Sequence, residues 1–191
     1  MDTSLAQNFL RMTAALLLWL LAIPAASAMP AIQHWVTDNG VRVYFVEAPE
    51  LPMVDINVTF AAGGVRDDGH AGLAHMTSTL LDMGAAGLSA DEISSRAESL
   101  GAELGTGSAR DMAWITLRSL SDAAHLQPAL KLLADVINRP DFNKKDFERE
   151  RERTQVAIRR SEQSPATVAE YTFFQSSYGE HPYAPRPGGT V

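Results

Sequence analysis

The sequence predicts an α+β fold, a largely antiparallel sheet with helices packed on one face. Three observations predict this class. Stretches of alternating apolar and polar residues come first and end at turn-forming residues, as half-buried strands do. Amphipathic stretches with capping signals of helices follow them. The order of strands followed by helices occurs twice along the chain, without an internal sequence repeat.

The strands are predicted from alternation and from the residues that end them. Residues 33–48 alternate on both sides of Asn39-Gly40, a dipeptide that favours the positive-φ turn of a hairpin. The strand after it ends at Gly63-Gly64, which is not a phosphate loop because no G-K-[ST] follows. Further strands are expected at residues 53–62, 102–108 and 111–120.

The helices are predicted from periodicity and from their end signals. Ser89 is a helix N-cap, and Glu92 three residues later is its capping-box partner, in a helix that ends at Gly101. A later helix is stopped by Pro140. The remaining helices are expected at residues 70–83, 126–140, 144–162 and 165–178.

Composition excludes several classes of protein. The chain of 191 residues contains no cysteine, which excludes a thiol enzyme, a Cys-rich zinc knuckle and a disulfide scaffold. The net charge of −7 argues against a nucleic-acid partner. The basic residues of 149–160 alternate with glutamates, and the run 148–153 is interpreted as a solvated helix face.

Residues 1–28 are predicted to be a signal peptide. Arg11 precedes the apolar run TAALLLWLLAIPA, and Ala26-Ser27-Ala28 is a small-x-small cleavage pattern. Cleavage after Ala28 predicts a periplasmic or secreted protein; the alternative is an inner-membrane protein anchored by the uncleaved signal. Residues 29–191 are expected to form one domain. That domain is interpreted as truncated at its C-terminus, since the turn-rich residues 178–191 end without a strand or helix.

The segment AGLAHMTSTLLDMG, residues 71–84, resembles a helical zinc site that has lost its donors. Two histidines at i and i+4 on a helix can share a metal ion, and a glutamate between them can take a proton from metal-bound water. The inverted signature H-x-x-E-H has this arrangement. Here His75 stands at the first position, Ser78 at that of the base and Thr79 at that of the second histidine.

The surrounding segments resemble the N-terminal domain of the insulinase/pitrilysin zinc peptidases, the inverzincins. They are GGVRDDGH before GLAH, LLDMGAAGLSADEISSRAESLGAEL after it, RPDF at 139–142 and the run DFERERERTQVAIRRSEQSP. HPYAPRPGGT is similar to that family's HPYG-x-P-x-x-G-T segment. The resemblance covers the chain from about Gln33 onward and implies a sheet with helices as the fold.

The resemblance implies that the zinc chemistry is lost. In that family a glutamate of the long charged helix is the third ligand, and its position falls on Ala157, with a supporting acid at Glu150. The vestigial metal positions are therefore His75, Thr79 and Ala157, and the degenerate base position is Ser78. Zinc needs about three protein ligands, so no metal, no cofactor and no peptide hydrolysis by this chain alone are expected.

The resemblance also implies a role. In the bacterial and mitochondrial-processing type, a subunit without the zinc motif forms chamber wall and substrate contacts beside an active one. We expect a non-catalytic subunit of this type, a hetero-oligomer with an active zinc peptidase that acts on peptide substrates. Two alternatives stay open: a non-functional fragment, or a metallohydrolase with zinc in a rearranged site around His75 and His70. Its further candidate groups are Asp67, Asp68, Asp82 and His181, although Asp67-Asp68 is interpreted as a solvated loop pair and His125 as a surface histidine.

Overall fold

The computed structural model describes Met12 and residues 31–190. The chain divides into two compact units, residues 1–51 and residues 52–191, and each is described by itself. The predicted signal peptide and its cleavage point after Ala28 lie outside the described residues, Met12 apart. Among the described residues, no helix combines the length and the apolar character needed to cross a membrane.

The first unit contains a β-hairpin, as the Asn39-Gly40 turn predicts. Strand β1 (Ile32–Val36) pairs antiparallel with β2 (Arg42–Val46). Gly40 adopts a φ of 87°, a conformation that glycine takes without steric cost. The rings of His34 and Tyr44 lie opposite each other across the two strands, with centroids 4.7 Å apart.

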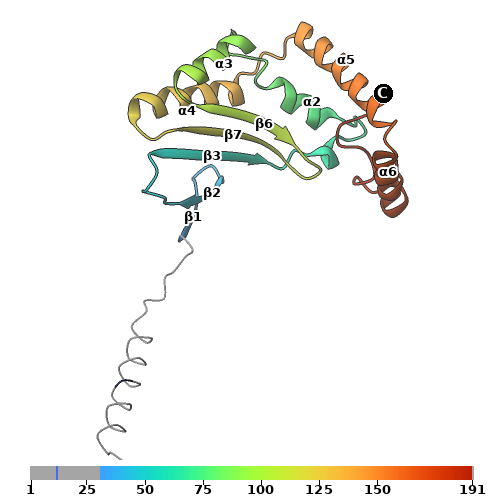
Figure 1. The fold of residues 1–191 in the computed structure, drawn as a ribbon, viewed down its shortest axis with the longest axis horizontal. Helices are drawn as coiled ribbons and strands as arrows, with labels where there is room; N and C mark the ends of the chain where they lie inside the picture. The colour runs from blue at the N-terminus through green and yellow to red at the C-terminus, as the bar shows by residue number, and fades with distance from the viewer. Residues whose placement is uncertain (1–11, 13–30, 191) are drawn as a thin grey trace, which may run out of the picture. The chain divides into compact units, whose positions relative to one another are not determined.

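The second unit is built on an antiparallel sheet with the strand order β3-β7-β6 (Figure 1). All three predicted strands are confirmed: β3 (Met53–Phe60), β6 (Glu103–Ser108) and β7 (Ala113–Leu120). A separate short ladder pairs β4 (Gly84–Ala85) with β5 (Leu88–Ser89). Strands of two residues are too short to show alternation, so the sequence did not predict them.

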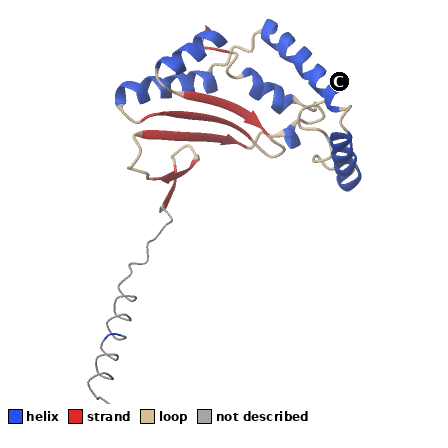
Figure 2. Cartoon of the chain, viewed as in Figure 1, coloured by secondary structure: helices blue, strands red, loops and turns tan. Residues whose placement is uncertain are grey.

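Helices cover one face of the three-stranded sheet, which confirms the predicted α+β class (Figure 2). Ile115 and Leu117 of the central strand point into this layer and are buried against Val136 and its neighbours. The other face carries polar side chains that include Arg118 and Asp55, which form an ion pair at 2.7 Å. The helices are η1 (Gly64–Arg66), α2 (Leu73–Leu80), α3 (Ala90–Ser99), α4 (Ala123–Asn138), α5 (Lys144–Ser161) and α6 (Pro165–Tyr178).

Helix ends follow the capping chemistry of the sequence. The Ser89 hydroxyl accepts the Glu92 N–H at 3.4 Å, and the Glu92 carboxylate accepts the Ser89 N–H at 2.8 Å, so the predicted capping box is confirmed. α4 begins three residues earlier than predicted, because the Asp122 carboxylate accepts the Ala124 N–H at 3.2 Å. His125 lies in the first turn of this helix, with 40% of its side chain exposed.

α2 begins three residues later than predicted, and a distant carboxylate caps it. Its N-cap, Gly72, has a φ of 96° and no side chain with which to cap the helix. Instead Asp67 accepts the N–H of Gly72 at 2.8 Å and that of Ala74 at 3.0 Å. Asp67 is 5% exposed, so the interpretation of Asp67-Asp68 as a solvated pair is wrong for Asp67 and holds only for the exposed Asp68.

The tail segment, residues 181–190, packs against the start of α2. A Cβ atom on Gly72 would lie 2.9 Å from the Cα of Gly189, so the two backbones meet at a distance that only glycine permits. The Tyr183 hydroxyl donates to Asp111, in the turn between β6 and β7, at 2.6 Å. The Gln175 amide of α6 donates to a tail carbonyl at 3.0 Å. The tail segment thus joins α2, α6 and the sheet.

Asp67→Asn is expected to lower the free energy of unfolding by about 1–2 kcal/mol, because an amide offers one acceptor oxygen where two N–H groups need one each. Urea denaturation followed by circular dichroism measures the change. Asp68→Asn is the matched control, since Asp68 is exposed and asparagine tolerates its φ of 45°. An equal loss at both positions would contradict the capping role.

Candidate functional site

The two degenerate positions of α2, Ser78 and Thr79, both form hydrogen bonds within the fold. α2 packs against β6 and against α5. Ser78 is 3% exposed, and its hydroxyl donates to the carbonyl of Gly107 in β6 at 3.1 Å. The Thr79 hydroxyl donates to the carbonyl of His75, one turn earlier, at 2.9 Å. At the position of the base, Ser78 therefore joins the helix to the sheet. At the position of the second ligand, Thr79 forms a hydrogen bond within the helix.

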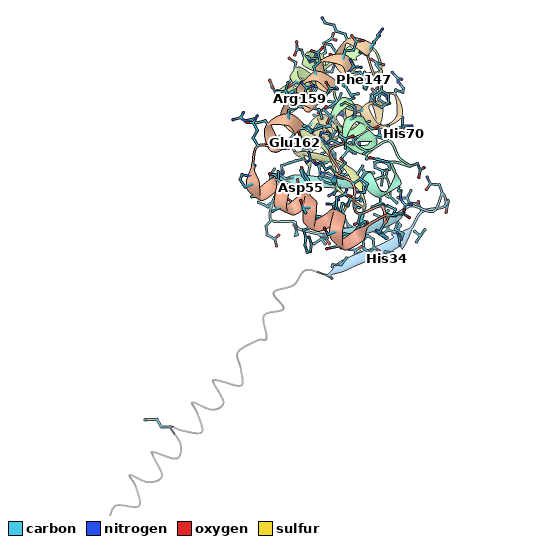
Figure 3. All side chains as sticks on the ribbon, turned by 90° about the vertical axis from the view of Figure 1, so that its right-hand side faces the viewer. His34, Asp55, His70, Phe147, Arg159 and Glu162 are labelled. Atoms are coloured by element: carbon cyan, nitrogen blue, oxygen red, sulfur yellow. The ribbon has the colours of Figure 1, made fainter. Side chains whose placement is uncertain are left out.

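His75 is half-buried on the same helix and lies one turn before Thr79. Of the vestigial metal positions, His75 alone offers a strong donor, because Ala157 on α5 is exposed and has no donor atom in its side chain. Figure 3 shows Phe147 and Arg159 on the helix that carries Ala157. One imidazole and one hydroxyl do not fit a zinc centre, which takes three or four nitrogen, sulfur or carboxylate ligands.

Glu150, the position matched to a supporting acid, lies two turns before Ala157 and is buried, at 5% exposed. Its carboxylate meets Arg149 at 3.2 Å and Arg153 at 3.7 Å. The interpretation of residues 148–153 as a wholly solvated face is therefore wrong at Glu150. A run of alternating charges does not indicate which of its residues is buried. In α5, Glu150 lies toward α2, while the neighbouring glutamates are exposed.

Asp82, just past the end of α2, is the second acid of this region and is half-buried. Burial raises the pKa of Asp82 above its ordinary value of 3.8, and the negative charge of Glu150 raises it further. A hydrogen bond from the backbone N–H of Asp82 itself acts in the opposite direction. Two acids thus lie close together between α2 and α5, with arginines on the Glu150 side.

The structure does not bring the other proposed metal groups to His75. His70 is exposed in the loop before α2 (Figure 3), and Asp67 is committed to capping that helix. His181 lies instead at a pocket that Asp67 and Asp68 also line. Across Met12 and residues 31–190, no three His, Asp or Glu side chains gather closely enough to hold one metal ion.

Two arginines that sequence reasoning missed lie at this same pocket, Arg110 and Arg186. Arg110 lies in the turn between β6 and β7, and Arg186 in the tail segment. No local pattern distinguishes either from a solvated arginine. Only the fold brings each of them over an aromatic ring of α6.

Of the four positions that the resemblance assigns to zinc chemistry, three hold a small or hydroxyl side chain and only His75 keeps a donor. The family model described as Insulinase (Peptidase family M16) matches residues 42–186. The chain belongs to this family, as its resemblance at the level of sequence indicated. No curated protein matches the chain.

Solved structures similar to the chain include the following two. A domain described as a peptidase M16 inactive domain, from Pseudomonas fluorescens, is 39% identical with a TM-score of 0.81, over 83% of this chain and 38% of that one. A protease from Helicobacter pylori is 23% identical with a TM-score of 0.75, over 85% of this chain and 39% of that one, and shows the fold alone. The chain thus spans less than two fifths of either structure.

The likeness to the inactive domain and the side chains of α2 support the same interpretation. At 39% identity, the Pseudomonas fluorescens domain is a homologue that carries the description inactive. In this chain, Ser78 and Thr79 stand where the family has a base and a ligand. These observations support a non-catalytic homologue of the peptidase family.

Asp82→Asn is expected to stabilise the protein at neutral pH and to have little effect in acid. A carboxyl group whose pKa is raised by folding binds its proton more tightly in the native state. Its contribution to stability therefore falls as the pH rises from 3.8 through the raised pKa, and asparagine removes that fall.

Thermal unfolding at about pH 3.5 and about pH 7 measures the difference, with Asp68→Asn as the control for loss of an exposed charge. A melting temperature of Asp82→Asn below that of the parent protein at neutral pH would contradict the interpretation.

Proposed function

We propose that this protein is a non-catalytic subunit that pairs with an active zinc peptidase of its own family and contributes chamber wall and substrate contacts. The observation that carries the proposal is the state of α2. Its degenerate positions belong to a well-packed helix, with Ser78 buried and hydrogen-bonded to β6 at 3.1 Å. A helix that remains well packed although its metal donors are replaced supports a role in binding other molecules rather than in catalysis.

The proposed partner supplies what this chain lacks. An active family member offers two histidines, a glutamate ligand and a glutamate base, whereas this chain offers His75 alone. Peptides are the proposed substrates, and hydrolysis is assigned to the partner. The periplasm is the proposed compartment, on the strength of the signal-peptide pattern that ends at Ala28.

Co-purification from the native host tests the pairing. We expect the chain to carry with it a family member with an intact H-x-x-E-H, identified by mass spectrometry. The peptidase activity of the pair should exceed that of the partner alone, because both halves are needed to enclose a substrate. Replacement of the partner's motif glutamate by glutamine should remove the activity.

His75→Ala in this chain is the matched control for that experiment. It should leave the activity of the pair in place, because no chemical step runs through His75. A chain that purifies without such a partner, or a pair whose activity is lost on His75→Ala, would contradict the proposed function.

Restoring the donors tests whether the scaffold is a former zinc site. The double variant Thr79→His with Ala157→Glu recreates, with His75, the ligand set implied by the family, and we expect it to bind about one zinc ion per chain. Metal analysis by inductively coupled plasma mass spectrometry after dialysis measures the zinc. The parent protein should hold only background metal.

Thr77→His with Val156→Glu is the control, since it adds the same groups at exposed positions of the same two helices. Equal zinc in both double variants would contradict a prepared site. Zinc in the parent protein that is lost on His75→Ala would favour the alternative, a metallohydrolase with a rearranged site around His75 and His70.

A further inference from the structure

A pocket of about 390 Å³ lies where the tail segment passes the start of α2 and the C-terminal half of α6. Its volume falls in the range of small-ligand sites. The two arginines of this pocket come from distant parts of the chain, Arg110 from the turn between β6 and β7 and Arg186 from the tail segment. None of the degenerate zinc positions lines it.

Both guanidinium groups are held in place by aromatic rings of α6. The guanidinium carbon of Arg110 lies 3.8 Å from the centroid of the Phe174 ring, and that of Arg186 lies 3.5 Å from the centroid of the Tyr171 ring. Positions three residues apart on a helix share a face, so the two rings hold the two cations side by side along α6. Stacking covers the face of a guanidinium and leaves its N–H groups free at the edge.

Most of these N–H groups have no partner among the described residues. Arg110 donates one hydrogen bond, from Nη1 to the carbonyl of Pro185 at 3.0 Å. Arg186 also donates one, from Nη1 to Glu162 at 3.2 Å, although its side chain is only 19% exposed. A guanidinium carries five N–H donors, so each arginine retains several for a ligand.

Glu162, outside the pocket lining, forms an ion pair with Arg186 at 3.2 Å, whereas the acids that line the pocket pair with neither arginine. Both oxygens of Asp67 are occupied by the N–H groups at the start of α2. Asp68 and Glu180 are exposed at the rim. The Tyr183 N–H donates to Nδ1 of His181 at 3.2 Å, so a neutral His181 ring carries its proton on Nε2, as a further donor at the pocket.

We propose that this pocket binds the carboxylate of a peptide through Arg110 and Arg186. Stacked, pre-oriented guanidiniums fit the planar, two-oxygen geometry of a carboxylate, and their fixed position limits the entropy lost on binding. The proposal deepens the proposed function, on which it rests for the choice of a peptide as the source of the carboxylate. It gives the chain a substrate contact of its own, away from the degenerate zinc positions.

Calorimetric titration of the purified chain tests the proposal with three probes. They are N-acetylated tetra-alanine with a free C-terminal carboxylate, its C-terminal amide, and the same amide with glutamate as the third residue. We expect the free acid to bind at least about tenfold more tightly than the simple amide, the difference that one lost charge-assisted hydrogen bond produces. Tighter binding of the glutamate peptide than of the simple amide would show that the pocket also binds a side-chain carboxylate.

Arg110→Gln and Arg186→Gln should each weaken binding of the free acid at least about tenfold. Arg159→Gln is the matched control, because Arg159 is an exposed arginine of α5 outside the pocket. Circular dichroism checks that each variant is folded. Arg110→Lys and Arg186→Lys, which keep the charge but lose the paired donors, replace any glutamine variant that does not fold, and should also weaken binding.

Equal affinity for the acid and both amides, no saturable binding of any probe, or unchanged binding by the arginine variants would overturn the proposal. These outcomes are independent of the pairing experiment, since the titration needs no partner. If the chain binds the carboxylate but captures no zinc peptidase, the proposed site is supported and the proposed function is contradicted. If the chain pairs with a zinc peptidase but does not bind the free acid, only the proposed carboxylate site is contradicted.

Discussion

The carboxylate of Asp67 is the contact on which the arrangement around α2 depends. The first N–H groups of a helix have no partners within it, and Gly72 cannot supply one. Asp67 lies in the loop before α2 and accepts two of these N–H groups. These two hydrogen bonds fix the residue at which the helix begins. The helix that begins there packs against both β6 and α5. In this arrangement the Ser78 hydroxyl donates to the carbonyl of Gly107.

The replaced donors suit a helix that has no cation beside it. Glu150 and Asp82 already place two acids between α2 and α5, and burial raises the pKa of Asp82 above its ordinary value. A third carboxylate at Ala157, two turns after Glu150, would add to that charge, although Arg149 and Arg153 already pair with Glu150 and water screens an exposed position such as Ala157. The alanine at this position adds no charge to the pair of acids.

Much of the fold could be predicted from the sequence because its signals are local. The alternation around Ile115 and Leu117 identified the central strand, and Ser89 with Glu92 identified the start of α3. The resemblance to a peptidase family indicated the degenerate positions, since their spacing is preserved along the chain.

The parts that escaped prediction depend on contacts between distant segments. From the sequence alone, Asp67 is predicted to be a solvated loop residue. Only the structure shows that it accepts the N–H groups at the start of α2. Glu150 is one glutamate among several, and only the packing of α5 shows which one is buried. Arg110 and Arg186 acquire their character from two rings of α6, which no spacing in either segment indicates.

The backbone contact between Gly72 and Gly189 makes residues 179–189, which include most of the tail segment, a strap of fixed length. One end is set at the close of α6, and the other is set where the two glycines touch. Arg186 lies between these points, over Tyr171. Insertion or deletion of one residue in the strap would shift Arg186 off its ring or Gly189 off its partner. Exposed strap positions such as Glu180 can change their side chain without changing this length.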